Sequence, residues 1–253
     1  IPAGQRVAIV GQNGSGKTTL VKHLNGLLRP AAGTVRIGSD SIAGEPVHRL
    51  ARTVGFVFQD PDDQLFNRTV EREVRFGPTN LELPAAEVDR LVDAALEATG
   101  LSAVRRANPY DLNVSDRKLV ALASVLAMDP AVLVLDEPTT GQDGPGIERV
   151  GAIVDALGAA GRTVVAITHD MEFAARHFRR IVVMRTGEVV ADGPPETIFA
   201  PSNAALLAST GLTPPPAARL AALIGLPGVP LTAEALLDAL EDLEADGAGG
   251  ARS

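Results

Sequence analysis

Gly11-Gln12-Asn13-Gly14-Ser15-Gly16-Lys17-Thr18 is the stretch that decides the fold, because it joins a glycine-rich turn to a lysine and a hydroxyl. An apolar run at 7–10 precedes it and a helix-like segment from Thr19 follows it, so the order is strand, loop and helix. The spacing of a glycine, four residues and then Gly-Lys-Thr is that of a phosphate-binding loop. The stretch therefore predicts a nucleoside triphosphate site in an α/β protein.

The side chains and backbone of this loop suit ATP with Mg²⁺. Glycines let the backbone curl until its N–H groups point at one anion, and the positive end of the following helix favours the same spot. Lys17 can reach the β- and γ-phosphates, and the Thr18 hydroxyl can ligate Mg²⁺. We expect the nucleotide to contact Asn13, Gly14, Ser15, Gly16, Lys17, Thr18 and Thr19.

Composition narrows the class of protein. The net charge of −8 without a basic run argues against a nucleic-acid partner. The absence of cysteine excludes disulfides and thiolate metal sites. No apolar stretch approaches the ~20 residues of a membrane span, so a cytoplasmic protein that can dock on the inner face of a membrane fits best. The chain begins at Ile1 rather than Met, and reads as a piece of something longer.

Buried strand-like runs alternate with helical patterns along the chain. The runs at 54–58, 131–135 and 163–168 are rich in β-branched residues, which predicts a mostly parallel, doubly wound sheet. Residues 181–190 resemble a terminal hairpin. The first helix is expected to end before Pro30, and a second, amphipathic helix to bury Val88, Leu91, Val92, Ala95 and Leu96 on one face.

Three parts are expected along the chain. Residues 1–60 and 130–200 form the nucleotide-binding core, and 61–129 form an inserted helical subdomain. A Pro-rich break opens a small helical tail over 201–253. Its last residues, 245–253, are rich in Gly and Ala and are expected to be disordered.

Polar side chains follow directly after the predicted strands. In doubly wound sheets ligands bind at the carboxyl ends of the strands, so these side chains should gather at one edge. Asp136, ionised at neutral pH, can hold Mg²⁺, and Glu137 beside it is the candidate general base for an attacking water. Gln59 could sense Mg²⁺ or that water, and His169 could hydrogen-bond the γ-phosphate.

The order of these motifs resembles the ATPases of ABC transporters over about residues 1–199. The loop at 11–18, Gln59, 135–139, 141–143 and 168–170 match the Walker A, Q-loop, Walker B, D-loop and switch-histidine motifs. The resemblance implies the P-loop ATPase fold of that family, with a mostly parallel sheet and a helical subdomain. It also implies hydrolysis of ATP in a head-to-tail dimer in which Asp143 belongs to the D-loop.

A narrower likeness is to the ATPases of energy-coupling factor transporters. Residues 58–66, 69–74 and 76–78 carry it, together with the Pro-rich tail. It implies an importer of vitamins or transition-metal ions, docked on a transmembrane coupling protein beside a substrate-binding membrane subunit. We expect 64–77, with Asp62, Asp63, Glu71 and Glu73, to form part of the docking groove.

The sequence departs from the family in three places. The first strands of the family, with the residue that stacks on adenine, would precede Ile1. Gln142 stands where the D-loop usually has Leu. The signature Leu-Ser-Gly-Gly-Gln is replaced after Leu112 by Asn113, Val114, Ser115 and Asp116. Asn113, Ser115 and Asp116 are good helix-capping residues, whereas the branched side chain of Val114 and the charge of Asp116 should weaken contact with phosphate.

Three functions remain open at this point. The first is the ATPase subunit of an importer of the energy-coupling factor type, working in an asymmetric heterodimer or a fused pair of cassettes in which a second ATPase subunit supplies an intact signature. The second is a regulatory subunit that binds ATP with little turnover, which the altered signature favours and the intact Glu137 and His169 oppose. A soluble ABC protein without a transport role is the third, although such proteins usually carry two cassettes or a long insertion.

Overall fold

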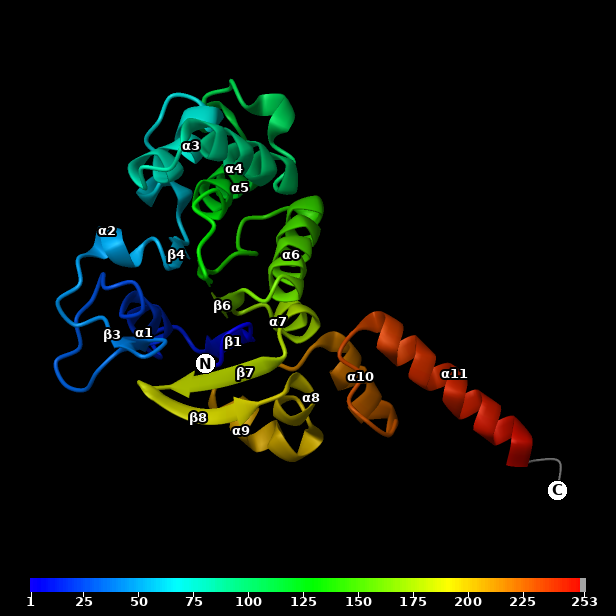
Figure 1. The fold of residues 1–253 in the computed structure, drawn as a ribbon. Helices are drawn as coiled ribbons and strands as arrows, with labels where there is room; N and C mark the ends of the chain where they lie inside the picture. The colour runs from blue at the N-terminus through cyan, green and yellow to red at the C-terminus, as the bar shows by residue number, and fades with distance from the viewer. Residues whose placement is uncertain (251–253) are drawn as a thin grey trace. The chain divides into compact units, whose positions relative to one another are not determined.

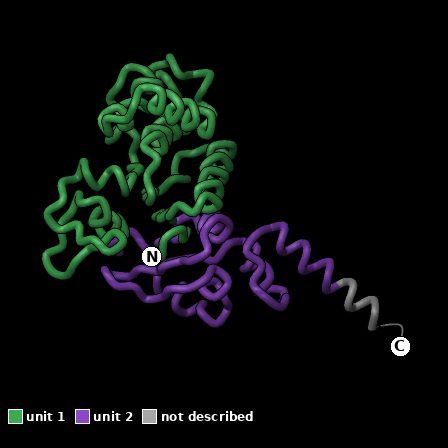
Figure 2. Tube along the Cα trace, viewed as in Figure 1, with its two compact units in different colours: residues 1–6, 17–168 green, residues 7–16, 169–253 purple. Residues whose placement is uncertain are grey.

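The structure of the chain, a computed structural model, describes the backbone of residues 1–250 and the side chains of residues 1–243. The chain forms two compact units, distinguished by colour in Figure 2. The first comprises residues 1–6 and 17–168, and the second comprises residues 7–16 and the part of the chain from 169 onward. Residues 11–16 of the phosphate-loop sequence therefore belong to the second unit, while Lys17 and Thr18 belong to the first.

Parallel strands form the centre of the first unit. β4 (Val54–Val57) pairs with β5 (Val132–Asp136), which pairs with β6 (Thr163–Ile167). Nearly every position of these strands is buried, as expected for strands covered on both faces. The prediction of a mostly parallel α/β sheet is confirmed. Separately, β2 (Arg36–Ile37) and β3 (Asp40–Ser41) form a small antiparallel ribbon.

Helices of the first unit fall into two groups. α3 (Val70–Asn80), α4 (Ala85–Ala98) and α5 (Val114–Leu126) pack on one another at the top of Figure 1. α4 buries Val88, Leu91, Val92, Ala95 and Leu96, which confirms the predicted amphipathic face. The other helices are α1 (Lys17–Lys22), α2 (Val47–Leu50) and α6 (Gly144–Ala159).

The first helix ends before Pro30, as predicted, but it stops well ahead of the proline, so Pro30 is not what ends it. α1 ends at Lys22, and tighter turns follow, with the Leu24 N–H bonded to the carbonyl of Val21. The imidazole Nδ1 of His23 lies 2.7 Å from the Thr19 carbonyl oxygen. Gly26 then adopts a left-handed φ of 75°, a conformation that stops a helix.

Glu73 is not a surface residue, so its predicted place in an acidic docking groove is wrong. Its side chain is only 2% exposed and accepts hydrogen bonds from the backbone N–H groups of Phe66 and Asn67. A buried carboxylate needs such donors, and here it fixes the loop before α3. Glu71 stays at the surface, where it pairs with Arg105 at 2.8 Å.

The second unit combines three strands with several helices. β1 (Arg6–Gly11) runs parallel to β7 (Arg180–Arg185), and β7 pairs with β8 (Glu188–Gly193) as an antiparallel hairpin, as predicted. The helices are α7 (Met171–His177), α8 (Pro195–Ile198), α9 (Ala204–Ser209), α10 (Pro216–Ile224) and α11 (Ala233–Gly250).

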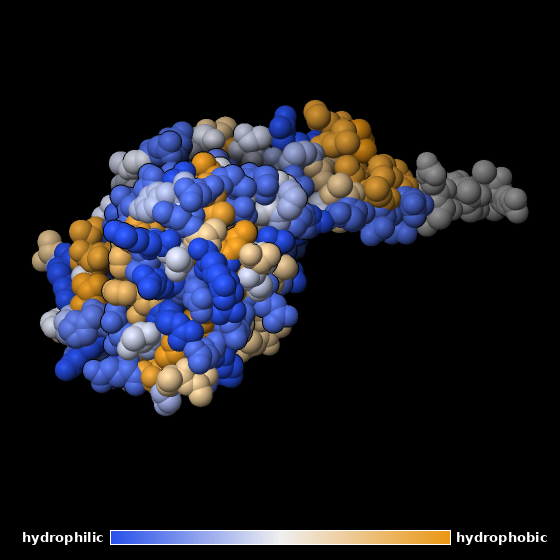
Figure 3. Space-filling model, turned by 90° about the horizontal axis from the view of Figure 1, so that it is seen from above, coloured by the Kyte–Doolittle hydropathy of each residue, from blue (hydrophilic) through white to orange (hydrophobic). Residues whose placement is uncertain are grey.

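α10 and α11 form a small helical pair with its own apolar contacts. Ala217, Ala221, Leu226 and Leu236 are buried between them. Hydrophobic side chains also gather on the surface of this part of the chain in Figure 3. Leu223 of α10 is 80% exposed. The predicted disorder of 245–253 stays a prediction, since α11 is described through Gly250 and 251–253 lie outside the described residues. Within the part that is described, no helix has the length and apolar character to cross a bilayer.

Candidate nucleotide-binding site

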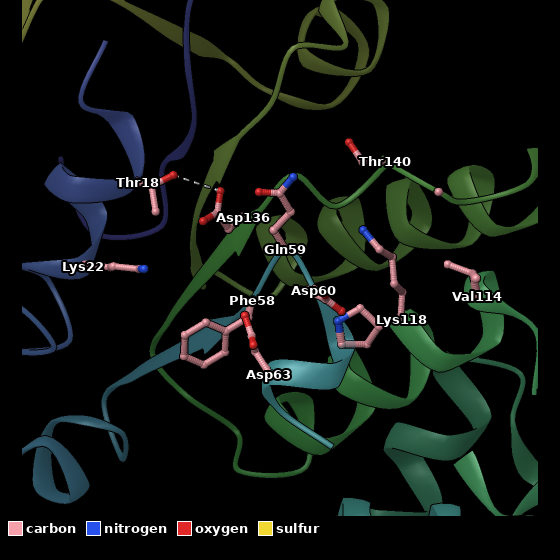
Figure 4. A pocket seen from close by; sticks show the side chains of 12 residues that line it. Thr18, Lys22, Phe58, Gln59, Asp60, Asp63, Val114, Lys118, Asp136 and Thr140 are labelled. Carbon is pink, nitrogen blue, oxygen red and sulfur yellow. Dashed lines mark hydrogen bonds between the residues drawn. The ribbon is translucent and has the colours of Figure 1, made fainter. Parts of the chain in front are cut away.

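A pocket of about 490 Å³ opens in the first unit where several elements end or begin. α1 contributes Thr18 and Lys22, the segment after β4 contributes Gln59, and β5 contributes Asp136. Figure 4 shows these side chains around the pocket, with Val114 and others of α5 on the opposite wall. Residues that are far apart in sequence thus meet at the carboxyl ends of the parallel strands, as the motif order predicts.

Thr18 and Asp136 bring two oxygen ligands together. The Thr18 hydroxyl lies 3.5 Å from a carboxylate oxygen of Asp136, the contact dashed in Figure 4. Hard oxygen donors of this kind suit Mg²⁺, which uses few protein ligands and keeps several waters. The described residues contain no cluster of three or more metal-binding side chains, so a magnesium ion here would rely on this pair and the nucleotide.

Burial shifts the pKa values of two charged residues at the pocket, Asp136 and Lys17. The carboxyl of Asp136 is 5% exposed, and desolvation raises its pKa, an effect opposed by the Thr18 hydroxyl and reinforced by the neighbouring Glu137. Desolvation lowers the pKa of the Lys17 ammonium, while the charges of Glu137 and Asp136 act to raise it. Ionised Asp136 therefore lowers the free energy of unfolding of the nucleotide-free protein.

We expect Asp136→Asn to raise the thermal midpoint of the nucleotide-free chain at neutral pH by about 2–4 °C. The raised pKa means that Asp136 stabilises the fold only while protonated, and this contribution is lost as pH rises through the folded-state pKa. Asparagine has no charge to bury. Melting curves from acid to neutral pH should show the variant's advantage growing with pH, and an advantage independent of pH would contradict the explanation. Magnesium-dependent ATP binding should weaken.

Glu137 follows directly after β5 in a constrained backbone conformation. Its backbone N–H donates to the carbonyl of Ile167 at 2.9 Å, and its φ of 50° is in the left-handed region. The residue is 9% exposed. The Glu137 carboxylate lies near Asp136 and the Lys17 ammonium and is largely shielded from solvent, a setting that suits a general base, and that role stays a prediction.

The second unit holds His169 and the predicted loop residues 13–16. At Gly11 an added Cβ would lie 2.2 Å from the Met184 carbonyl oxygen, so only glycine allows β1 to run into the loop. Ser15 is buried, and its carbonyl accepts the Gly187 N–H at 3.0 Å. His169 is exposed and precedes α7, whose N-cap is Asp170. The roles predicted for His169 and for the loop residues stay predictions.

The family model described as ABC transporter matches residues 1–140. The chain belongs to the ABC transporter family. An EcfA ATP-binding protein of an energy-coupling factor transporter from Methanoculleus marisnigri is 43% identical over 216 residues, which is 85% of this chain and 77% of that protein. EcfA1 from Methanospirillum hungatei is 44% identical over 215 residues, 85% of this chain and 77% of that protein. The predicted kinship with ABC ATPases of this type is confirmed.

A solved structure supports the same fold. CbiO1 from Clostridium perfringens, described as part of the ABC transporter complex CbiONQ, aligns with a TM-score of 0.74 at 34% identity and covers 89% of both chains. The chain also spans only 36% and 37% of the length of two Methanosarcina relatives that it matches at 44% and 41% identity. The cassette described here is thus also found as one part of larger proteins.

The stretch 113–116, which the sequence predicts to be an altered signature, forms the start of α5 and its cap. Asn113 is the N-cap of α5, and its side-chain oxygen accepts the Asp116 N–H at 2.8 Å. The Asn113 amide in turn donates to the Asp116 carboxylate at 2.9 Å. The first of these bonds satisfies a free backbone N–H at the start of the helix, and the second holds the Asn113 side chain in place, so this stretch caps α5 as the sequence predicts. Val114 follows the cap with 47% of its surface exposed.

Two pocket residues were missed by sequence reasoning. Lys118 on α5 lines the pocket, and burial lowers its pKa while Asp60, Glu137 and Asp136 act to raise it. The Thr140 hydroxyl is buried beside the same pocket without a hydrogen-bond partner among the described residues. Neither belongs to a short motif, so only the folded arrangement brings them into view.

Proposed function

We propose that the chain is the ATP-hydrolysing subunit of an energy-coupling factor importer of vitamins or transition-metal ions. The observation that carries the proposal is the meeting of Thr18, Asp136 and Gln59 in one pocket, with Lys17 and Glu137 beside it. The EcfA and CbiO relatives, which are named as parts of transporters, support the transport role. We further propose that the chain works at the inner face of the membrane.

Each side chain has a distinct task in this proposal. Lys17 neutralises the β- and γ-phosphates, Thr18 and Asp136 would hold Mg²⁺, and Glu137 accepts the proton of the attacking water. Magnesium, when bound, neutralises charge on the transferred phosphoryl group. Gln59 orients the water, and His169 contacts the γ-phosphate. Because little covalent chemistry is needed, positioning and electrostatics supply most of the rate.

We propose in addition that the active assembly is asymmetric. In the family, a signature glycine N–H and serine at the start of a helix bind the γ-phosphate held by the other subunit. Here Val114 puts a branched, exposed side chain at the first turn of α5, which opposes a close approach of phosphate to the backbone. Asp116 adds a negative charge in that turn. A second cassette with an intact signature would complete this chain's own site.

A regulatory role with little turnover is a second candidate, and the substituted first turn of α5 is the observation that favours it. The two candidates differ in one measurement. ATP hydrolysis should be slow for the chain alone and fast after mixing with a cassette whose signature is intact. Equally slow hydrolysis in the mixed complex, with ATP bound, would favour the regulatory role.

The docking surface for the membrane subunit is proposed next to the Q-loop. Phe66 and Phe76 are 59% and 47% exposed, and their rings pack edge to face with centroids 4.7 Å apart. Asp62 and Asp63 are exposed on the short helical turn between Gln59 and this aromatic pair. An exposed aromatic pair flanked by carboxylates fits a partner helix with apolar and basic side chains.

Phe66→Ala is expected to weaken the complex with the transmembrane coupling protein by about 30-fold, the scale of a buried aromatic anchor at an interface. ATP binding to the chain should stay within twofold. Affinity can be measured by titrating the detergent-solubilised membrane partner onto the labelled chain. Leu223→Ala, which trims an 80% exposed side chain of α10, is the matched control and should leave the affinity unchanged. Unchanged affinity in the Phe66 variant would disprove this docking surface.

A further inference from the structure

Two positions at which the chain departs from its family contact each other. Ser115 on α5 stands at a signature glycine position, and Gln142 stands at the D-loop position that is usually Leu. The Ser115 hydroxyl donates to the side-chain oxygen of Gln142 at 2.5 Å and lies 3.0 Å from a carboxylate oxygen of Asp143. Glycine at 115 or leucine at 142 could not form this contact, so the two substitutions match.

Gly146 leaves the space in which this contact forms. A Cβ added there would lie 2.3 Å from the Gln142 side-chain oxygen and 2.6 Å from the Ser115 hydroxyl. Gly146 is buried in the first turn of α6, where alanine is intrinsically the better helix former. The absence of a side chain at 146 is therefore explained by the room that Gln142 and Ser115 occupy.

The hydrogen bond between Ser115 and Gln142 joins the start of α5 to the loop 138–143. The loop 138–143 follows Glu137 and is folded into successive turns. The Thr140 N–H donates to the Glu137 carbonyl, and the Gln142 N–H donates to the Thr139 carbonyl. The other segment is the start of α5, which carries the altered signature. On the same side of the loop, a Cβ at Gly141 would lie 3.4 Å from a methyl group of Val114. The start of α5 therefore rests directly on this loop.

We propose that Gln142 is a positioning residue for ATP hydrolysis, which acts through Ser115. Its side chain fixes the start of α5 against the loop 138–143, which follows Glu137. The general base of this chain's own site and the segment 113–116, which would face a partner cassette, therefore move together. The inference rests on the proposed function of the chain as an ATPase subunit in a two-cassette complex. The inference gives a structural reason for Ser115 in the signature and Gln142 in the D-loop, two positions at which the chain departs from its family.

A double-mutant cycle tests the proposal in the complex with a signature-intact partner. Ser115→Ala and Gln142→Leu should each lower kcat about tenfold, the scale of a small misplacement of reacting groups, with KM for ATP within twofold. The double variant should be no slower than the slower single variant. Ser115→Thr keeps the hydroxyl and should retain activity. Gly146→Ala should resemble Gln142→Leu, because its methyl group separates the same atoms.

Controls separate positioning from general loss of structure. Thr99→Val removes another buried hydroxyl of the first unit, which donates to the Ala95 carbonyl at 2.7 Å on α4, and should leave kcat unchanged. Losses that multiply in the double variant, or that Thr99→Val reproduces, would overturn the proposal.

Hydrogen exchange on the chain alone gives a readout that does not need turnover. Gln142→Leu should speed amide exchange over 114–118 about tenfold, whereas Thr99→Val should not. Unchanged exchange in the Gln142 variant would overturn the inference even in an active complex. Absence of turnover in the wild-type complex would instead contradict the proposed function, and the exchange result would still decide the positioning role.

Discussion

Replacing Glu137 with glutamine is expected to slow ATP hydrolysis by about 10²–10⁴-fold, the usual contribution of a general base. Glutamine keeps the length and planar shape of the side chain but cannot accept a proton. The backbone should not move, since the hydrogen bond from residue 137 to Ile167 involves only main-chain atoms. ATP binding should survive, because Lys17, Thr18 and Asp136 are untouched.

Single-turnover measurements in the assembled complex are the sharpest check, since they report the chemical step separately from product release. Binding of a fluorescent ATP analogue shows whether the site still fills. Glu97→Gln, at an exposed position of α4, is the matched control and should leave turnover normal. Near-normal hydrolysis by the Glu137 variant would remove this residue from the role of base.

Changing residues 113–116 to Ser-Gly-Gly-Gln is expected to raise the turnover of the chain alone by up to about 10²-fold. This is the scale on which single backbone or side-chain donors stabilise developing negative charge. Glycine in place of Val114 would let phosphate approach the start of α5, and removal of Asp116 would take an anion away from it. The helix should remain capped, because serine at the N-cap with glutamine three residues later forms a capping box.

The restored segment is best compared with and without Gln142→Leu. Glycine at 115 removes the hydroxyl that donates a hydrogen bond to the Gln142 side-chain oxygen. The chain that combines the restored segment with Gln142→Leu should therefore be the faster of the two. Steady-state ATPase assays at saturating Mg-ATP measure both, and circular dichroism monitors the helix content. If the unmodified chain alone already hydrolyses ATP as fast as the restored chain, the asymmetric assembly proposed here is wrong.

The sequence was most informative where local pattern and chemistry coincide. The buried β-branched runs predicted the parallel strands, and the capping residues at 113–116 predicted the start of α5, because both depend on nearest neighbours. The meeting of Thr18, Gln59 and Asp136 followed from the general rule that strand ends share one edge of a sheet. Kinship with ABC ATPases then came from the order of the motifs.

What the sequence could not provide depends on partners distant along the chain. Glu73 looks like any surface glutamate of an amphipathic helix, and only the folded loop reveals the N–H groups of Phe66 and Asn67 that make it a buried structural residue. Likewise, Gln142 reads in the sequence as a simple departure from the family, and only the fold shows that its side-chain oxygen accepts a hydrogen bond from Ser115. Such assignments need tertiary contacts, which no short pattern encodes.

The left-handed backbone of Glu137 has a practical meaning for anyone engineering this ATPase. A residue other than glycine in this conformation costs about 1–2 kcal/mol, and asparagine or glycine would adopt it with less strain. Selection of variants by heat resistance alone would therefore favour replacements at 137 that remove the proposed general base. With Glu137 in that proposed role, thermostability and turnover oppose each other at this residue, so a stabilised version of the chain has to be selected for both.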